Sequence, residues 1–536
     1  MPWQQHAARQ PTNEAIVHYE GGVATRRWTW RDLFDRAQFY SERLQSSRVK
    51  RGDVCALIIP HNAEFYPLYM GVVIAGAIPA VLAYPNPRIH PDKFRSGLMG
   101  MSRSSGLDWI LTDPGLHSII DPLVTSDGST IRGAIFPISD EPTANTSVVP
   151  IVSNPSEPCL LQHSSGTTGL QKAVMLSHRA VLDHVRSYSS SIGLSDADRV
   201  VSWLPLYHDM GLIAAFHLPL SMGITSIQLD PFEWVSAPVL FLQACSSERA
   251  TIGWLPNFAY NHMAMRVNDE DMTDVRLDTL RLLVNCSEPV RAESHDMFAA
   301  AFSRYGFNRS ALGACYAMAE TTFAVAQTVV GQEARRLDMS ARVCVSSGPP
   351  IAGCEVRVMD ATGEQVSEGI VGELEIKSLS MFDGYRNNPD ATRQVLRDGW
   401  YSSGDYGFIS DGEVFVIGRK KDIIIVAGKN VYPEDVEDAV SRVEGVLPGR
   451  VVAFGMEDPV IGTERIAIVA ETSAGADDYA RIKRAIIEAA MRVDISITSV
   501  YLVEPRWLIK SSAGKPSRQA NKERVVRDFA NEGASS

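Results

Sequence analysis

A run of glycines, hydroxyl side chains and one lysine between positions 160 and 173 is suited to binding a polyphosphate. It reads LLQHSSGTTGLQKA, an apolar lead-in followed by polar residues. Glycine lets the backbone approach an anion, serine and threonine donate hydrogen bonds, and lysine adds a point charge. The lysine follows the second glycine by three positions, so the spacing is not that of a Walker A loop. The candidate phosphate ligands are Ser164, Ser165, Gly166, Thr167, Thr168, Gly169 and Lys172, although composition alone also fits a flexible loop.

Two carboxylates further along the chain could serve other parts of a nucleotide. Glu320 lies in YAMAETT, where a carboxylate can hold Mg²⁺ directly or through water and the ring of Tyr316 can stack on adenine. Asp405 lies in YSSGDYG, and a carboxylate can accept hydrogen bonds from the two vicinal hydroxyls of a ribose. Taken singly, each motif is equally well explained by a turn or by the start of a helix.

In this order along the chain, the motifs resemble those of the adenylate-forming superfamily, which comprises acyl-CoA synthetases, fatty acyl-AMP ligases, peptide-synthetase adenylation domains and luciferases. The most specific string is GRKKDIIIVAGKNVYPEDVE, which starts at Gly418. The sequence departs from the usual pattern at Gln171, Ala173 and Ala319, where the superfamily commonly has proline, glycine and threonine. The resemblance implies ATP and Mg²⁺ as cofactors, Glu320 as the metal carboxylate, and nucleotide contacts from Ser287, Glu288, Pro289, Tyr316, Ala317, Thr321, Asp405 and Arg419.

The resemblance also implies a mobile catalytic lysine and a hinge. Lys515, in SAGKPSR, matches the loop that carries this lysine, and Lys421 matches the hinge between two lobes. A carboxylate becomes an acyl donor when it attacks the α-phosphate of ATP and forms a mixed anhydride with AMP. Lys515, Mg²⁺ held through Glu320 and the hydroxyl loop would neutralise the charge that develops as pyrophosphate leaves. The expected second step, after rotation about the hinge, is transfer to the phosphopantetheine thiol of an acyl carrier protein or CoA.

Two strings resemble the fatty acyl-AMP ligase branch, LPLYHDMGLI from Leu204 and PNFAY from Pro256. The resemblance places His208 near the acyl carboxylate, with a structural histidine as the alternative, and predicts an acyl pocket formed by Trp254, Asn257, Phe258, Met210 and Gly211. The indole of Trp254 would fill the volume of several methylenes, which predicts a medium-chain, branched or ring-bearing acid. Only 52 positions separate Glu320 from Gly372, too few for the insertion usual in this branch, so carrier protein and CoA both stay open as acceptors.

Two other functions stay open. The first is an amino-acid or aryl-acid adenylating enzyme. An enzyme that activates amino acids would need an acidic group for the α-amine, and Asp209 is the candidate, although the surrounding YHDMGL suits acyl substrates. A non-catalytic nucleotide-binding relative is disfavoured because the matched lysine, glutamate, aspartate and arginine are all present.

The elements that must position these residues follow an α/β pattern. Apolar β-branched runs alternate with helical patterns through the first four hundred residues, with strands expected at 200–206 and 280–284 and helices at 238–245 and 293–305. Glycine turns at 363–377 indicate a small β-rich subdomain, followed by a strand–turn–strand unit at 412–419 and 423–426. The last portion combines helices at 433–443 and 481–492 with a strand at 451–454.

We therefore predict an α/β fold with a large N-terminal lobe, made of two α/β sheets and a small β subdomain, and a small mobile α/β C-terminal lobe. The N-terminal adenylate-forming domain is assigned to residues 1–418 and the C-terminal mobile domain to 419–536, with the boundary at 418–421.

Composition narrows the class of protein. A chain of 536 residues is long enough for more than one core, and its net charge of −12 argues against a nucleic-acid partner. Seven scattered cysteines without a CxxC pair indicate reduced thiols, and with no secretory pattern in the first residues they predict a cytoplasmic protein. The apolar run at 68–85 is interrupted by Gly71, Gly76 and Pro79, so we expect a buried helix leading into a core strand, not a transmembrane segment.

Overall fold

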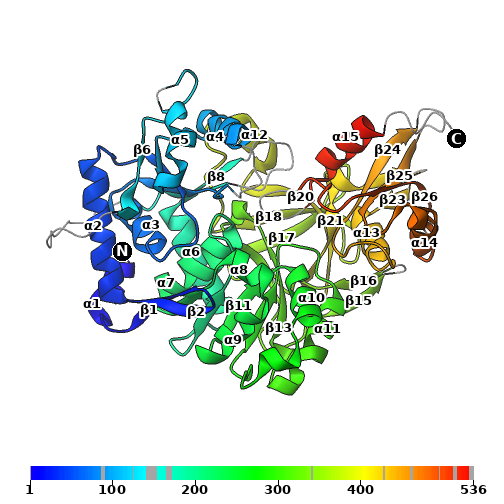
Figure 1. Ribbon diagram of the computed structural model, residues 1–536, viewed down its shortest axis with the longest axis horizontal. Helices are drawn as coiled ribbons and strands as arrows, with labels where there is room; N and C mark the ends of the chain where they lie inside the picture. Colours follow the sequence, from blue (N-terminus) through cyan, green and yellow to red (C-terminus); the bar gives the residue numbers. More distant parts are fainter. Residues whose placement is uncertain are drawn as a thin grey trace.

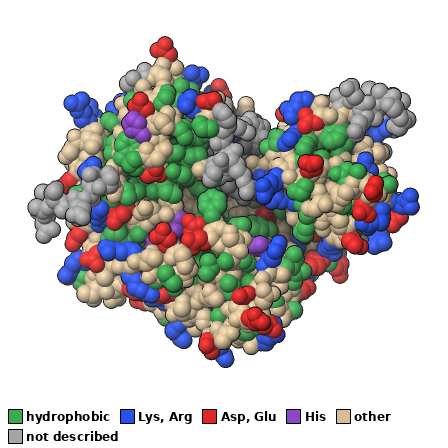
Figure 2. Space-filling model, in the orientation of Figure 1, with side chains coloured by type: hydrophobic (Ala, Val, Ile, Leu, Met, Phe, Trp, Pro, Cys, Tyr) green, Lys and Arg blue, Asp and Glu red, His purple; other side chains and the backbone are tan. Residues whose placement is uncertain are grey.

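The computed structural model describes residues 2–85, 91–124, 126–139, 154–163, 172–339, 342–426, 429–458, 463–493, 495–510 and 516–529. The chain forms a large N-terminal body and a smaller C-terminal lobe, which stands apart at the right of Figure 1. Figure 2 shows a notch between the two on the upper edge of the molecule. The mixed α/β architecture with its separate C-terminal lobe agrees with the predicted fold class.

The largest sheet of the N-terminal body has the strand order β14-β13-β12-β11-β9-β10-β1-β2. It is parallel from β13 to β1 and antiparallel at both edges. Its inner strands are short and mostly buried, as expected for parallel strands that helices cover on both faces. The strands are β1 (Glu14–Glu20), β2 (Val23–Thr29), β9 (Arg199–Ser202), β10 (Thr225–Gln228), β11 (Ile252–Leu255), β12 (Leu282–Asn285), β13 (Leu312–Ala317) and β14 (Ala324–Gln327).

A second sheet, with the order β6-β5-β3-β4-β7-β8, completes the two sheets that were predicted for the N-terminal lobe. It is parallel except for the last pair, β7 and β8, between which the candidate phosphate loop lies in the sequence. The strands are β3 (Val54–Ile58), β4 (Ile78–Val81), β5 (Trp109–Thr112), β6 (Gly133–Ile135), β7 (Pro158–His163) and β8 (Ala173–Ser177).

The apolar run at 68–85 forms the C-terminal part of helix α3 (Phe65–Ile74) and then strand β4, as predicted. Every residue of α3 is buried. Gly71 allows it to pack closely on α2 (Trp30–Ser46), because a Cβ at this position would lie 2.7 Å from the Cβ of Tyr40. Within the described residues, no helix combines the length and the apolar character that crossing a membrane would require.

A small antiparallel sheet forms the predicted β-rich subdomain. It contains β17 (Cys354–Met359), β18 (Gly372–Ser378), β19 (Leu396–Arg397), β20 (Trp400–Ser410) and β21 (Glu413–Arg419). The expected strand–turn–strand unit of 412–419 and 423–426 is wrong in its pairing. β21 pairs with β20, whereas β22 (Ile424–Val426) pairs with β23 (Lys429–Val431), and the short 3₁₀ turn Lys420–Asp422 (η9) lies between β21 and β22.

The C-terminal lobe has its own apolar cores. Its sheet contains β24 (Val451–Asp458), β25 (Thr463–Glu471) and β26 (Ile497–Val503), accompanied by α13 (Pro433–Ser441), α14 (Tyr479–Met491) and α15 (Arg518–Asp528). One face buries side chains such as Val436, Ile468 and Ile482, and the other buries Val452 and Val525. Both clusters are separate from the large core of the N-terminal body.

Several predicted elements differ from the observed ones at their ends. The strand expected at 200–206 stops at Ser202, whose hydroxyl accepts the N–H of Leu204 at 3.0 Å just before Pro205. The helix expected at 293–305 is α11 (Ala292–Phe302), followed by a 3₁₀ turn. The helix expected at 238–245 is α9 (Val239–Ser247). The cysteines are free thiols, as predicted, and of the seven all but Cys354 are buried.

Candidate active site

Three predicted nucleotide ligands meet where β13, β20 and β21 come together. The hydroxyl of Tyr316, at the end of β13, donates to Oδ2 of Asp405 at 2.7 Å. Nε of Arg419 lies 3.5 Å from Oδ1 of the same carboxylate, because Asp405 and Arg419 are register partners on β20 and β21. Burial, and then the Asp405 carboxylate, raise the pKa of Tyr316 well above its ordinary value, so its phenol remains a donor. Residues from distant parts of the sequence thus form one polar cluster.

The turn that carries Glu320 follows β13 directly. It is a 3₁₀ turn over Ala319–Thr321 (η8), closed by Thr322 at a φ of 71°, a left-handed conformation that is uncommon for threonine. Both threonines are fully buried. The hydroxyl of Thr321 lies 3.0 Å from the carbonyl oxygen of Phe323, and that of Thr322 donates to the carbonyl of Ser380 at 2.9 Å. These bonds hold the turn, so this arrangement does not favour the phosphate contact predicted for Thr321.

The Glu320 carboxylate is linked to a residue that the sequence analysis missed. The hydroxyl of Tyr385 donates to Oε1 of Glu320 at 2.8 Å, and Nζ of Lys172 lies 4.5 Å from the centre of the Tyr385 ring. Burial, and then the charge of Glu320, raise the pKa of Tyr385, which keeps its hydroxyl protonated. A Gly-Tyr pair in a connecting segment has no chemical signature of its own, so only the fold identifies Tyr385.

The segment from Asn285 to Arg291, which contains Ser287, Glu288 and Pro289, is held by one side chain. Oδ1 of Asn257 accepts from Nδ2 of Asn285 at 2.9 Å and from the backbone N–H of Arg291 at 3.0 Å. Its Nδ2 donates to the hydroxyl of Ser294. Asn257 therefore supports the predicted adenine segment, and these contacts give it a structural role beside the predicted one in the acyl pocket.

The same segment contacts two elements of the predicted acyl pocket. Oε2 of Glu288 accepts the N–H of Phe258 at 3.0 Å, at the start of α10 (Asn257–Arg266). Ser287 has a φ of 69°, and its hydroxyl lies 3.8 Å from the sulfur of Met210. The adenine segment and the predicted acyl pocket are therefore direct neighbours.

His208 and Asp209 precede an eight-residue π-helix, Met210–His217 (η4). The carbonyl of His208 accepts the N–H of Leu212 at 2.8 Å, and its ring packs 4.8 Å from that of Tyr207. Gly211 is required here, because a Cβ would lie 2.3 Å from the carbonyl oxygen of Pro205. The π-helix packs against β9 and against β11, the strand that carries Trp254.

Trp254, on β11, is fully buried. Its Nε1 donates to the hydroxyl of Tyr188 on α6 (His178–Ser191) at 2.8 Å, and that hydroxyl donates to Oε1 of Gln327 at 2.9 Å. An indole held by this two-step chain cannot rotate without breaking a buried hydrogen bond, so its orientation is fixed.

Some predicted residues are not placed. Ser164, Ser165, Gly166, Thr167, Thr168, Gly169 and Lys515 lie outside the described residues. Lys172 is described and exposed next to β8. Lys421, in the turn between β21 and β22, has a pKa lowered by burial and by Arg419. Ala317 is half-buried at the end of β13, and Pro289 is exposed.

The residues present fit a Mg²⁺ ion that is shared with a nucleotide. Among the described residues, no group of three or more His, Cys, Asp or Glu side chains could hold a metal ion alone. In ATP-dependent enzymes, Mg²⁺ binds through one or two carboxylates together with the phosphates of the substrate. Glu320, whose Oε1 accepts the Tyr385 hydroxyl, would hold the ion directly or through its water shell.

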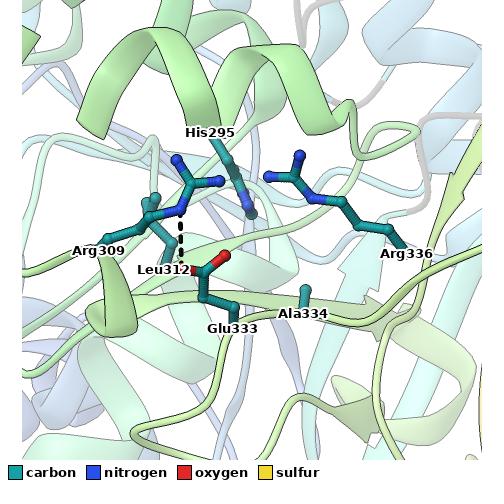
Figure 3. A pocket seen from close by; sticks show the side chains of 6 residues that line it. All are labelled: His295, Arg309, Leu312, Glu333, Ala334 and Arg336. Carbon is teal, nitrogen blue, oxygen red and sulfur yellow. Dashed lines mark hydrogen bonds and ion pairs between the residues drawn. The ribbon is translucent and has the colours of Figure 1, made fainter. Parts of the chain in front are cut away.

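A small cavity lies beside α11, the helix that carries His295 (Figure 3). It is lined by His295, Arg309, Leu312, Glu333, Ala334 and Arg336, and its volume of about 10 Å³ is at most that of one water. Both arginines are paired with Asp296, and Arg309 also bonds Glu333 at 2.8 Å. Because these charges balance, the cluster is a structural ion-pair network.

Comparison with known proteins places these features in a family. Residues 3–386 match the family model described as AMP-binding enzyme. The 4-hydroxyphenylalkanoate adenylyltransferase of Mycobacterium tuberculosis is 30% identical over 577 residues, which cover 97% of this chain and 91% of the relative. The medium-chain-fatty-acid–[acyl-carrier-protein] ligase JamA of Moorena producens is 29% identical, covering 92% and 88% of the two chains.

The fold is also that of a solved protein. A fatty acyl-adenylate ligase structure, from work on the E. coli and L. pneumophila enzymes, superposes with a TM-score of 0.89. It is 24% identical, and the match covers 99% of this chain and 98% of the other. The similarity extends over both lobes.

Proposed function

Because the chain belongs to the AMP-binding enzyme family and is an adenylate-forming ligase of fatty or other carboxylic acids, we propose that it activates a medium-chain, branched or ring-bearing acid and transfers it to a phosphopantetheine thiol. The observation that carries the proposal is the convergence of two clusters at the end of β13. Tyr316, Asp405 and Arg419 form one cluster, and Glu320, Tyr385 and Lys172 form the other.

In the first half-reaction, the carboxylate oxygen of the acid attacks the α-phosphorus of ATP, and the bond to pyrophosphate breaks. Asp405 accepts the ribose hydroxyls, and Tyr316 packs on the adenine. Lys172 and Lys515 place positive charge where the transition state accumulates negative charge. Mg²⁺, held by Glu320 and the phosphates, would add to this stabilisation. No base is needed, since the acid is already ionised.

The acyl end of the site supports a substrate of limited length. Trp254 is fixed by Tyr188 and Gln327, and the π-helix that begins at Met210 packs against the same strand. A rigid indole removes volume that a long chain would otherwise occupy. The relatives named above, one acting on medium-chain fatty acids and one on 4-hydroxyphenylalkanoates, support the same range.

For the second half-reaction we assign the C-terminal lobe, residues 419–536, as a mobile domain that turns about Lys421. Its separate apolar cores support this assignment, because a lobe with its own core can move as a unit. The thiol then attacks the acyl carbonyl, and AMP leaves. A relative named as an acyl-carrier-protein ligase supports a carrier protein as acceptor, and CoA presents the same thiol.

The proposal is tested by a single-turnover assay read by mass spectrometry. The enzyme, ATP and Mg²⁺ are mixed with a panel of straight-chain, branched, phenylalkanoic and amino acids, and CoA or a phosphopantetheinylated carrier protein is added afterwards. We expect acyl-adenylate from medium-chain or ring-bearing acids, and thioester with at least one acceptor. Adenylate from amino acids alone, or adenylate that neither thiol consumes, would contradict the proposal.

A further inference from the structure

Tyr385 lies between two groups that the proposed reaction uses. Its side chain is 5% exposed. Its hydroxyl donates to Oε1 of Glu320 at 2.8 Å, and its ring centre lies 4.5 Å from Nζ of Lys172. One side chain therefore contacts both the proposed metal carboxylate and the proposed phosphate-binding lysine.

The backbone fixes this position from the lysine side. The segment 383–386 runs beside the start of β8, where the N–H of Arg386 donates to the carbonyl of Ala173 at 2.9 Å. The N–H of Met175 donates to the carbonyl of Gly384 at 3.0 Å. Because Ala173 directly follows Lys172, the tyrosine and the lysine are held in register by main-chain bonds.

The same segment is tied to the glutamate turn. The N–H of Phe382 donates to the carbonyl of Glu320 at 2.8 Å, and the ring of Phe382 packs edge-on against that of Tyr385 at 5.0 Å. The N–H of Tyr385 donates to the hydroxyl of Thr392 at 2.9 Å. Both the backbone and the side chain of Glu320 therefore depend on this segment.

We propose that Tyr385 is a positioning residue that couples the two halves of the phosphate site. Its hydroxyl orients the Glu320 carboxylate that would hold the metal, and its ring face holds the ammonium of Lys172 by a cation–π contact. The inference rests on the proposed roles of Glu320 and Lys172, and it assigns a separate task to each part of the tyrosine.

The two tasks can be separated by substitution. Tyr385→Phe keeps the ring and removes the hydroxyl, and loss of a group that orients a metal ligand typically weakens metal binding by about tenfold. Tyr385→Leu also removes the ring. Loss of its cation–π contact with the exposed Lys172 corresponds to about threefold weaker binding of the nucleotide phosphates. Tyr40→Phe is the matched control, because the Tyr40 hydroxyl donates to Glu64 at 2.6 Å at a different place in the fold.

The experiment measures binding instead of turnover. Mn²⁺ is titrated into the full-length protein with a non-hydrolysable ATP analogue and followed by electron paramagnetic resonance, and the analogue alone is titrated by calorimetry. We expect Tyr385→Phe to weaken Mn²⁺ about tenfold with analogue affinity within twofold of the wild type. Tyr385→Leu should show the same loss of Mn²⁺ and about threefold weaker analogue binding, while Tyr40→Phe changes neither.

Double variants separate this inference from the proposed function. On a Glu320→Gln background, Tyr385→Phe should weaken Mn²⁺ no further, and on a Lys172→Met background, Tyr385→Leu should weaken the analogue no further. If Glu320→Gln alone leaves Mn²⁺ affinity unchanged, the proposed metal role of Glu320 is wrong. If Glu320→Gln weakens Mn²⁺ binding but Tyr385→Phe binds Mn²⁺ like the wild type, the inference about Tyr385 is overturned. It is also overturned if the losses of Mn²⁺ affinity in the two single variants add in the double variant. Melting temperatures confirm that each variant is folded.

Discussion

At the scale of single residues, Trp254 connects buried hydrogen bonding to substrate choice. Its indole could pack in several ways if only apolar contacts held it. The bond to Tyr188, and from Tyr188 to Gln327, selects one orientation, because breaking it would leave a buried donor unsatisfied. The sequence identifies the tryptophan, whereas the polar chain that fixes it is visible only in the fold.

We therefore expect Trp254→Ala to move the substrate preference toward longer acids. Each methylene that becomes buried contributes about 0.8 kcal/mol, or about fourfold in kcat/KM. The measurement is kcat/KM in pyrophosphate exchange over a series of straight-chain acids. Trp30→Ala is the control, since Trp30 is equally buried but lies on α2, and it should lower the melting temperature without moving the preference. Palmitate as the best acid of the wild type, with an unchanged profile in Trp254→Ala, would contradict this interpretation.

At the scale of elements, local patterns predict more than long-range pairing does. The helix and strand at 68–85 follow from one apolar run with Gly71, Gly76 and Pro79 as breaks, and the structure agrees. The predicted pairing of 412–419 with 423–426 is wrong because 412–419 pairs with β20 instead, and β20 precedes both segments in the sequence. The contacts of Tyr385 cannot be predicted from the sequence for the same reason, since its two partners lie far away in the chain, at positions 172 and 320.

The π-helix Met210–His217 gives a prediction at this scale. Gly211→Ala places a methyl group 2.3 Å from the backbone oxygen of Pro205, which cannot move without shifting the strand end before it. We expect a loss of about 1–3 kcal/mol in the free energy of unfolding and a parallel loss of adenylation. Gly97→Ala on α4 (Pro91–Ser105) meets no atom within 4 Å and should be neutral or stabilising. The measurement is urea unfolding of both variants. A free energy of unfolding of Gly211→Ala equal to that of Gly97→Ala would show that the turn tolerates a side chain at position 211.

At the scale of the whole molecule, the described contacts between the two lobes are both apolar and polar. Tyr432 packs against the cluster that contains Phe408 and Phe415, and Arg291 lies 3.8 Å from Asp435. Arg291 donates to the carbonyl of Glu434 at 3.0 Å, and Arg442 lies 3.9 Å from Glu293. The Arg442–Glu293 pair is exposed, and such pairs contribute little, typically below about 1 kcal/mol. We propose that the C-terminal lobe exchanges these contacts for others when it turns about Lys421.

Two variants should separate the half-reactions. Lys515→Ala should abolish adenylation but leave transfer from pre-made acyl-adenylate largely intact, since the lysine serves the first step only. Lys421→Pro should do the reverse, because proline fixes φ at the hinge, while Lys421→Ala should retain both steps. Each half-reaction is measured separately with the preferred acid. Equal loss of both steps in Lys515→Ala and in Lys421→Pro would contradict the assignment of Lys421 as the hinge.

The most direct test of the central claim is ATP–pyrophosphate exchange with and without an added carboxylic acid. The account predicts exchange that requires both the acid and Mg²⁺. Glu320→Gln should slow this exchange by about a hundredfold, which corresponds to about 3 kcal/mol of lost transition-state stabilisation. Exchange that is absent with every acid, or that proceeds at the wild-type rate in Glu320→Gln, would contradict it.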